Sequence, residues 1–123
     1  MLREINSHDW ADFCHRVSRE RQGATVRIET ILPNGSKTER VGDATFQSME
    51  LDTRNSCNDV ILLRVRNERE IAYDIVDPIH LLLRETQTGE DFNPVQIEAE
   101  NGTTLLTFQP AIHIGMLAGL KVD

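Results

Sequence analysis

The sequence predicts an α+β fold in which one N-terminal helix packs on a bent, mainly antiparallel sheet of about six to eight strands. One segment near the start has apolar residues at helical spacing, and most of the remaining chain alternates apolar and polar residues with a period of two. Short turn motifs separate the alternating runs. Short strands joined by tight turns can also close into a small barrel, and a two-sheet sandwich is the alternative architecture.

The predicted helix is the segment SHDWADFCHRVSRERQG, residues 7–23. Ser7 is a common helix-capping residue type, and Gly23 is the residue type that most often ends a helix. Four apolar residues fall at positions i, i+3, i+4 and i+7, so that a helix places them on one stripe. They are Trp10, Phe13, Cys14 and Val17.

Strands are predicted where apolar and polar residues alternate. The runs are residues 24–31, 37–47, 49–52, 60–67, 71–76, 79–86, 95–100 and 103–108. Turns are expected at PNGS (33–36), TRNSCND (53–59) and TGEDFNP (88–94). The pair Asn101 and Gly102 gives the clearest local signal, because it predicts a two-residue type I′ hairpin in which both residues have a positive φ.

The final segment, PAIHIGMLAGL, predicts a short C-terminal helix. Ile112, Met116 and Leu120 recur at four-residue spacing and share one apolar face in a helix. Gly115 and Gly119 weaken that helix, so it needs a surface on which to dock. The surface is either the open end of its own sheet or a second subunit. We expect a homodimer contact through the three apolar residues, with capping of the chain's own sheet as the alternative.

The chain of 123 residues fits a single α+β domain, residues 1–123. Its formal net charge of −7 argues against nucleic acid and anionic membrane surfaces as partners, because both bind basic surfaces. The longest apolar run is about half of a membrane span. Cys14 and Cys57 have no C-x-x-C spacing, and the chain start has no apolar signal segment. These features predict a cytoplasmic protein.

The stretch YDIVDPIHLLLRE places Asp74, Asp77 and His80 three residues apart, and these residue types can bind a metal ion. A three-residue spacing gathers side chains on one face only in a helix, and Pro78 disfavours a helix here. In a strand, Asp74 and Asp77 point to opposite faces. A tight bend at VDPI is the alternative that brings Asp74 and His80 together. The sequence predicts no metal site and no cofactor.

No catalytic residue is predicted either. Cys14 and His15 are adjacent on the predicted helix and point about 100° apart, whereas a nucleophile and its base must be within hydrogen-bonding distance. The sequence contains no nucleophile elbow, phosphate-binding loop or zinc-protease motif. A non-enzymatic role is therefore favoured over an enzymatic one.

Three motifs, EINSHDWADFCHRVSRERQG, DPIHLLLRE and ENGTTLLTF, together resemble a family of small uncharacterised bacterial proteins, a domain of unknown function of similar length. The resemblance covers nearly the whole chain. It implies a bacterial cytoplasmic protein, and it supplies no catalytic or ligand-binding residue that could be assigned here.

We expect the protein to be a non-enzymatic binding or assembly module of the bacterial cytoplasm that forms a homo-oligomer. The alternative is a small-molecule or anion-binding domain, or an enzyme, that uses arginines on the sheet. Arg27, Arg64, Arg66 and His80 form such a site if they converge in a pocket. If the arginines pair instead with acidic residues such as Glu39, they are surface groups of small energetic effect.

Overall fold

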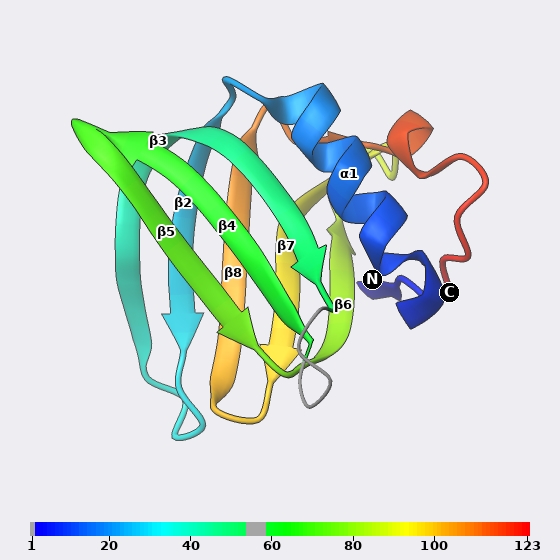
Figure 1. Ribbon diagram of the computed structural model, residues 1–123. Coiled ribbons are helices and arrows are strands. Elements are labelled where there is room, and N and C mark those ends of the chain that lie inside the picture. The colour runs from blue at the N-terminus through cyan, green and yellow to red at the C-terminus, as the bar shows by residue number, and fades with distance from the viewer. Residues whose placement is uncertain (1, 54–58) are drawn as a thin grey trace.

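The computed structural model describes residues 2–53 and 59–123 (Figure 1). The helical elements are η1 (Ser7–Asp9), α1 (Trp10–Arg21) and η2 (Ile114–Leu117), of which η1 and η2 are single 3₁₀ turns. The strands are β1 (Leu2–Glu4), β2 (Thr25–Ile31), β3 (Lys37–Asp52), β4 (Val60–Asn67), β5 (Arg69–Val76), β6 (Pro78–Glu85), β7 (Asp91–Ala99), β8 (Gly102–Gln109) and β9 (Ile112–His113). The predicted α+β class, a helix followed by an antiparallel sheet, is confirmed. Cys57 lies outside the described residues.

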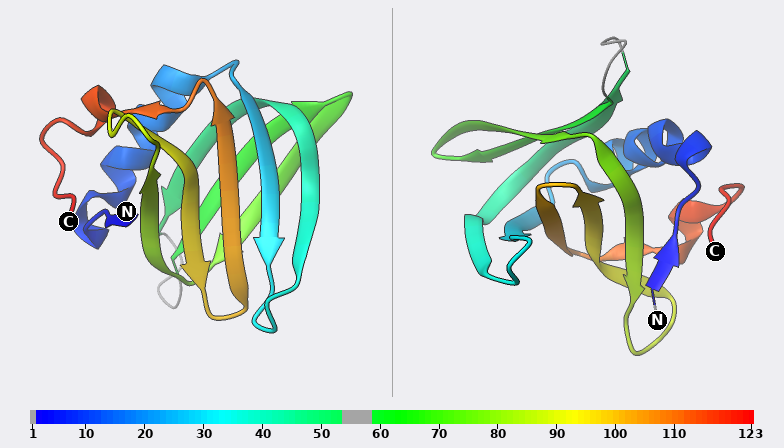
Figure 2. Two further views of the ribbon diagram at one scale, coloured as in Figure 1. Left: turned by 180° about the vertical axis from the view of Figure 1, so that it is seen from behind. Right: turned by 90° about the horizontal axis from the view of Figure 1, so that it is seen from below.

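The nine strands of the described residues belong to one antiparallel sheet, in the order β1-β6-β7-β8-β2-β3-β4-β5, with β9 added beside β7. The sheet folds over on itself and forms two layers. Figure 2 shows β6, β7, β8 and β2 in one layer, and Figure 1 shows β4 and β5 crossing in front of it. No pairing joins β5 to β1 or β6 in the described residues, so the sheet is not closed into a barrel.

The long strand β3 connects the two layers. Its first part, up to Thr45, pairs with β2, and its second part, from Thr45 onward, pairs with β4. The register shifts twice on the β2 side, at Gly42–Asp43 and at Arg40, and once on the β4 side, at Gln47. Such bulges bend a strand and increase its twist. The bulge at Gln47 explains why the alternation predicted two separate strands, 37–47 and 49–52, where the structure has one.

Helix α1 closes one end of the space between the layers and packs on β3 (Figure 1). Ser18 fixes this contact, because its hydroxyl donates to the Met49 carbonyl oxygen at 2.7 Å and accepts from the Met49 amide at 2.8 Å. The predicted apolar stripe of the helix is buried. The Trp10 indole, which is 4% exposed, also donates to the Ile5 carbonyl oxygen at 2.9 Å, so its polar atom is satisfied inside the core.

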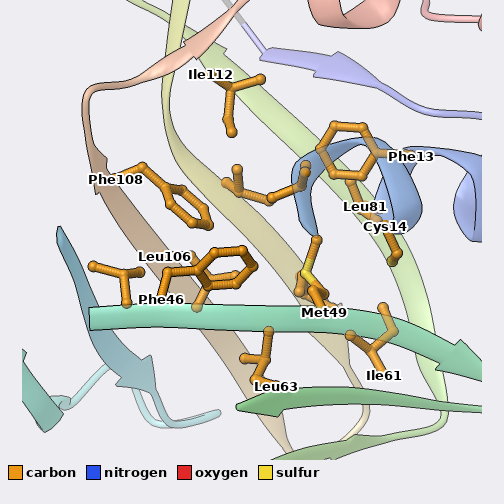
Figure 3. Packing of buried hydrophobic residues seen from close by; sticks show 14 of the residues in the cluster. Phe13, Cys14, Phe46, Met49, Ile61, Leu63, Leu81, Leu106, Phe108 and Ile112 are labelled. Atoms are coloured by element: carbon orange, nitrogen blue, oxygen red, sulfur yellow. The ribbon is translucent and has the colours of Figure 1, made fainter. Parts of the chain in front are cut away.

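The core lies between the two layers and beneath α1. Figure 3 shows Phe13 and Cys14 of α1 pointing into the same interior as Phe46 and Phe108. The rings of Phe46 and Phe108 meet edge to face, with centroids 5.1 Å apart and an interplanar angle of 81°. This geometry is favoured for aromatic pairs. The side chains come from distant parts of the sequence, so the core ties both layers to the helix.

The predicted hairpin between β7 and β8 is present, but its turn is shifted by one residue. Ala99 pairs with Gly102, which leaves Glu100 and Asn101 as the two loop residues. Asn101 does not have a positive φ, so the type I′ assignment is wrong. The positive φ falls on Gly102, at +144°. Glycine adopts this φ without strain, whereas asparagine adopts it less readily. Gly102 therefore takes this position as the first residue of β8, and the two loop residues are Glu100 and Asn101.

The C-terminal tail forms strand β9 and the η2 turn in place of a helix with one apolar face. Ile112 pairs with Phe92 of β7, and its side chain is completely buried in the core. Met116 and Leu120 are partly buried against the same core. The homodimer contact through these three residues stays a prediction, but Ile112 has no exposed surface with which to contact a second subunit.

Two arginines of α1 hold this tail. Arg21 donates from Nε and Nη2 to the Ala111 carbonyl oxygen at 3.1 and 2.6 Å. Arg16 donates from Nη1 to the Met116 carbonyl oxygen at 3.1 Å and to that of Ala118. These carbonyl groups bond to side chains, so the tail does not need helical hydrogen bonds to satisfy them.

The described part of the chain contains no helix with the length and apolar character needed to cross a membrane.

Candidate functional site

The arginines that the sequence singled out lie on the outer face of the folded sheet. Arg27 is on β2, with its guanidinium 3.6 Å from Glu39 and 3.4 Å from Asp43. Arg64 is on β4, 3.5 Å from Glu70. Strand β3 lies between β2 and β4. Both arginines are therefore paired with acidic neighbours on an exposed surface, where such pairs contribute little.

Arg66 and His80 are far apart in the sheet. Arg66 lies beside Thr45 of β3, near the start of β5. His80 is on β6, and four strands separate β6 from β4. The His80 Nδ1 atom is 2.7 Å from Glu4 Oε2, and this hydrogen bond raises the pKa of His80. The structure therefore does not bring Arg27, Arg64, Arg66 and His80 together.

Asp74, Asp77 and His80 do not meet at one point either. Asp77 forms a one-residue corner between β5 and β6 with φ at +54°, and its amide donates to the Asp59 carbonyl oxygen at 2.9 Å. Strands β5 and β6 leave this corner without pairing with each other. Within residues 2–53 and 59–123 there is no group of three or more histidine, cysteine, aspartate or glutamate residues that could hold a metal ion.

The Cys14 thiol is not arranged as a nucleophile. Its side chain is completely buried, and burial, with a smaller effect of the Glu50 charge, raises the pKa of Cys14 to about 12. A thiol with such a pKa is protonated at neutral pH and is a weak nucleophile. Cys14 is a core residue, as the helical stripe predicted.

The two edges of the sheet differ in how they are covered. Strand β1 has only three residues, and the tail runs along its outer side. Glu4 and Asp123 exchange two backbone hydrogen bonds of 3.0 and 2.9 Å, and the Asn6 amide donates to the Lys121 carbonyl oxygen at 3.0 Å. Ile5 also forms a bridge with Val122. This edge is therefore closed by the chain itself.

Strand β5 forms the other edge, and in the described part of the chain no strand pairs with its outer side. It has eight residues, all of which pair with β4 without a register shift. The bond from the Asp77 amide to Asp59 fixes which residues face β4, because N–H and C=O groups alternate in direction along a strand. The backbone groups that face away belong to Glu70, Ala72, Asp74 and Val76. We call this the β5 edge.

A cleft of about 230 Å³ is lined by residues of both layers, from β2, β3, β5, β8 and the turn between β7 and β8. We call it the interlayer cleft. Its floor includes the end of β2 and the turn between β7 and β8, which lie at the bottom of Figure 1. The residues that matter for its chemistry are Thr30, Arg40, Tyr73, Asp74, Asn101 and Thr104.

Three hydroxyl groups lie in the cleft. Thr30 Oγ1 and the Tyr73 hydroxyl are 3.0 Å apart and form a hydrogen bond between the two layers. Thr104 pairs with Thr30 across β8 and β2 and is 5% exposed. The Thr104 hydroxyl has no hydrogen-bond partner among the described residues. No completely buried side-chain oxygen or nitrogen in the described residues is unpartnered, so the Thr104 hydroxyl keeps some exposure, and Thr104 lines the cleft.

Arg40 reaches the cleft because of the bulge in β3. Val41 pairs with Ile28 and Glu39 pairs with Glu29, so Arg40 is the additional residue between two regular pairs. A bulge redirects a side chain relative to the normal alternation of a strand. Arg40 forms no ion pair or hydrogen bond with another described residue. Its guanidinium is therefore available to a ligand.

A second cleft, of about 320 Å³, lies between α1 and the tail and contains Arg16, Arg21 and His113. Its groups are already used within the chain. Arg16 and Arg21 hold the tail carbonyls, Arg16 also pairs with Asp12 at 3.2 Å, and His113 Nδ1 accepts from the Gly115 amide at 3.0 Å. The polar groups of this cleft attach the tail to α1. The interlayer cleft is therefore the better candidate for a ligand-binding site.

Comparison with models of known protein families, with curated proteins and with solved structures finds no match for this chain. The β5 edge and the interlayer cleft therefore have to be interpreted from their own geometry. The resemblance to a bacterial family of unknown function, and the bacterial origin that it implied, stay predictions.

Proposed function

We propose that the protein is a non-enzymatic binding module that accepts an extended segment of a partner protein on the β5 edge. In this mode of recognition a peptide adds one strand to an exposed sheet edge, and main-chain hydrogen bonds provide much of the affinity. The observation that carries the proposal is the contrast between the two edges, one closed by the tail and the other open over eight residues.

An open edge of this kind is uncommon in a soluble domain. Edges are usually protected by short strands, bulges, prolines or lysines, because their free N–H and C=O groups pair with other chains. Strand β5 contains no proline or lysine and no register shift, and Val76 at its end is 45% exposed. A partner strand satisfies these groups and covers this apolar side chain.

The charges around the edge favour a basic partner. Four acidic residues occur from the start of the β4–β5 turn to the corner before β6, against one arginine in β5. They are Glu68, Glu70, Asp74 and Asp77. An extended segment with lysine or arginine side chains complements this surface, and such complementarity increases specificity and association rate.

The same charges oppose pairing of β5 with a second copy of itself. An antiparallel register centred on Ala72 places Glu70 opposite Asp74, and a register centred on Asp74 places that residue opposite its own copy. A register centred on Tyr73 avoids both contacts but still brings two acidic edges together. Like charges directly opposite each other destabilise a sheet. We therefore infer a different protein as the partner on this edge. The homo-oligomer and the cytoplasmic location stay predictions. The free thiol of Cys14 supports the cytoplasmic location, because disulfides are rare in that compartment.

Selection from a library of random peptides displayed on phage tests this proposal. We expect the selected peptides to be rich in β-branched and basic residues, and to bind Ala72→Pro at least about tenfold more weakly than the wild type. Proline removes one outward N–H group and leaves the bonds to β4 intact, whereas Ala72→Ser keeps the N–H and serves as the matched control.

Amide hydrogen exchange gives a second readout. Peptide binding should slow exchange at Glu70, Ala72, Asp74 and Val76, whose amides face away from β4, and should leave the other amides of β5 unchanged. Selected peptides that bind Ala72→Pro as tightly as the wild type, with no protection on the β5 edge, would show that the site lies elsewhere. A dimer formed through β5 would refute the choice of a separate partner.

A further inference from the structure

The interlayer cleft has polar groups in an interior that is otherwise apolar. The inward positions of β2 hold Val26, Ile28 and then Thr30, and β8 pairs with this strand so that Thr104 lies opposite Thr30. Buried hydroxyl groups are normally satisfied by a hydrogen bond. Thr30 meets this requirement through Tyr73, whereas the Thr104 hydroxyl has no described partner and is directed to the cleft.

Arg40 adds a positive charge to the same cleft. Arg40 lines it and forms no bond to any other residue that the structure describes, unlike Arg27 on the neighbouring strand. A guanidinium group with several free N–H donors matches a carboxylate, because two parallel hydrogen bonds can form. The three hydroxyl groups deeper in the cleft can exchange hydrogen bonds with a hydroxyl group of the same ligand.

Size and charge restrict the ligand further. The volume of about 230 Å³ is below the range of about 300–1,000 Å³ that is typical of sites for drug-sized molecules, so the ligand must be small. Among the described residues that line the cleft, Arg40 is the only cation, and the protein carries a net charge of −7. A dianion such as a phosphate ester meets repulsion here, whereas a monoanion can be held by the single Arg40.

We propose that the interlayer cleft binds a small monocarboxylate that carries a hydroxyl group. Arg40 holds the carboxylate, and Thr104, with Thr30 and Tyr73, bonds the hydroxyl group. Binding is reversible and involves no covalent step. This site is separate from strand addition on the β5 edge, since its polar groups come mainly from β2, β3 and β8, so either proposal can fail without the other.

Isothermal titration calorimetry with L-lactate and D-glycerate tests the inference. Propionate lacks the hydroxyl group, glycerol lacks the carboxylate, and inorganic phosphate is largely a dianion above its second pKa. We expect lactate and glycerate to bind, propionate to bind about two- to tenfold more weakly, and glycerol and phosphate to show no binding.

Three variants assign the effect to residues. Arg40→Gln should weaken lactate binding by about tenfold or more, since a hydrogen bond to a charged group is lost. Thr104→Val keeps the shape of the side chain and should reduce the preference for lactate over propionate. Arg66→Gln changes another sheet arginine outside the cleft and should leave binding unchanged. Thermal unfolding of each variant confirms that it is folded.

Several results would overturn the inference. These are the absence of heat with both hydroxycarboxylates, equal binding of lactate and phosphate, an Arg40→Gln variant that is folded and binds lactate as the wild type does, or an equal loss in Arg66→Gln. A preference for lactate over propionate that is undiminished in Thr104→Val would contradict the role assigned to that hydroxyl group. Peptide binding to the β5 edge does not enter any of these outcomes.

Discussion

His80 combines an exposed imidazole with a close carboxylate. It lies on β6 and its Nδ1 atom is 2.7 Å from Glu4 of β1, with Glu98 on β7 nearby. The hydrogen bond to Glu4 raises the pKa of His80, and the charges of Glu4 and Glu98 act in the same direction, whereas partial burial opposes them. This pair links the short edge strand β1 to the sheet.

We predict a pH dependence from this pair. A folded-state pKa above the unfolded value, which is about 6.5, gives stability that is fully present below that pH. The stability is lost as the pH rises through the higher folded pKa. The effect is small, because the two side chains are 47% and 42% exposed and solvent screens the pair. An NMR titration should therefore give His80 a higher pKa than in Glu4→Gln. An unchanged pKa in Glu4→Gln would contradict the assignment.

Part of the candidate site could be predicted from the residue pattern of the sequence. Thr30 and Thr104 occupy inward positions of two strands where valine, isoleucine or leucine is usual, and an alternation analysis that asked for polar residues at such positions would find them. That these two threonines are opposite each other, and that Tyr73 reaches Thr30, depends on the register and on the folding of the sheet. The position of Arg40 at the cleft depends on the bulge in β3, and the alternation of apolar and polar residues alone does not reveal where a bulge occurs.

At the scale of elements, the β7–β8 hairpin offers a test of the turn geometry. A Cβ atom at Gly102 lies 2.9 Å from the Ile31 carbonyl oxygen, and φ is +144° there. Gly102→Val should therefore destabilise the protein by about 2 kcal/mol or more, from backbone strain and steric overlap. Urea unfolding measures this change.

Asn101→Val is the control for this prediction, because Asn101 does not have a positive φ. It should change stability by only a few tenths of a kcal/mol, as exposed substitutions usually do. A large loss in Asn101→Val together with a small loss in Gly102→Val would restore the type I′ turn that the sequence predicted.

The elements that the sequence predicted correctly are those with a strong local pattern. The helical stripe from Trp10 to Val17 and the alternation of β2 and β4 are local, so both elements were found. Strands β1 and β9 have three and two residues and exist only through pairing with β6 and β7, which no local pattern reveals. The polar start of β7 at Asp91 resembled a loop for the same reason.

At the scale of the molecule, the tail determines whether a single chain is stably folded as a monomer. Removal of the residues after Gln109 deletes the buried Ile112 and Leu117 and also the pairing of β1 with Asp123. We expect this truncated chain to lose several kcal/mol of stability or to aggregate, because each buried side chain contributes about 1.5–3 kcal/mol. Unfolding in urea and light scattering measure both effects.

A shorter truncation after Leu120 serves as the comparison. It keeps both buried residues and removes the backbone pairing with the N-terminal strand, the bond from Lys121 to Asp9 and the partly buried Val122, so we expect a smaller loss. The opposite outcome is a dimer that becomes a stable monomer when the residues after Gln109 are removed. That result would support the homodimer contact through Ile112, Met116 and Leu120 against the intrachain arrangement.

Whether the sheet closes is a property that the sequence did not decide. The strand order depends on pairings such as that of β2 with β8, whose residues are far apart in the chain. Closure further depends on the angle at which the two layers leave β3 and on the corner at Asp77. These are long-range effects of twist and bulges, so barrel, sandwich and open sheet were all compatible with the local patterns.

The pairing of the N-terminal segment with the tail has a consequence for synthesis on the ribosome. The Asp9 carboxylate accepts from the Lys121 amide at 2.8 Å across 112 positions of the chain. The N-terminal segment of this chain is therefore synthesised long before its partners in the tail. At about 5–20 residues per second, the nascent chain carries Ile5 for several seconds before Val122 can pair with it. During this interval the N-terminal segment presents apolar surface of the kind that chaperones protect from aggregation during synthesis.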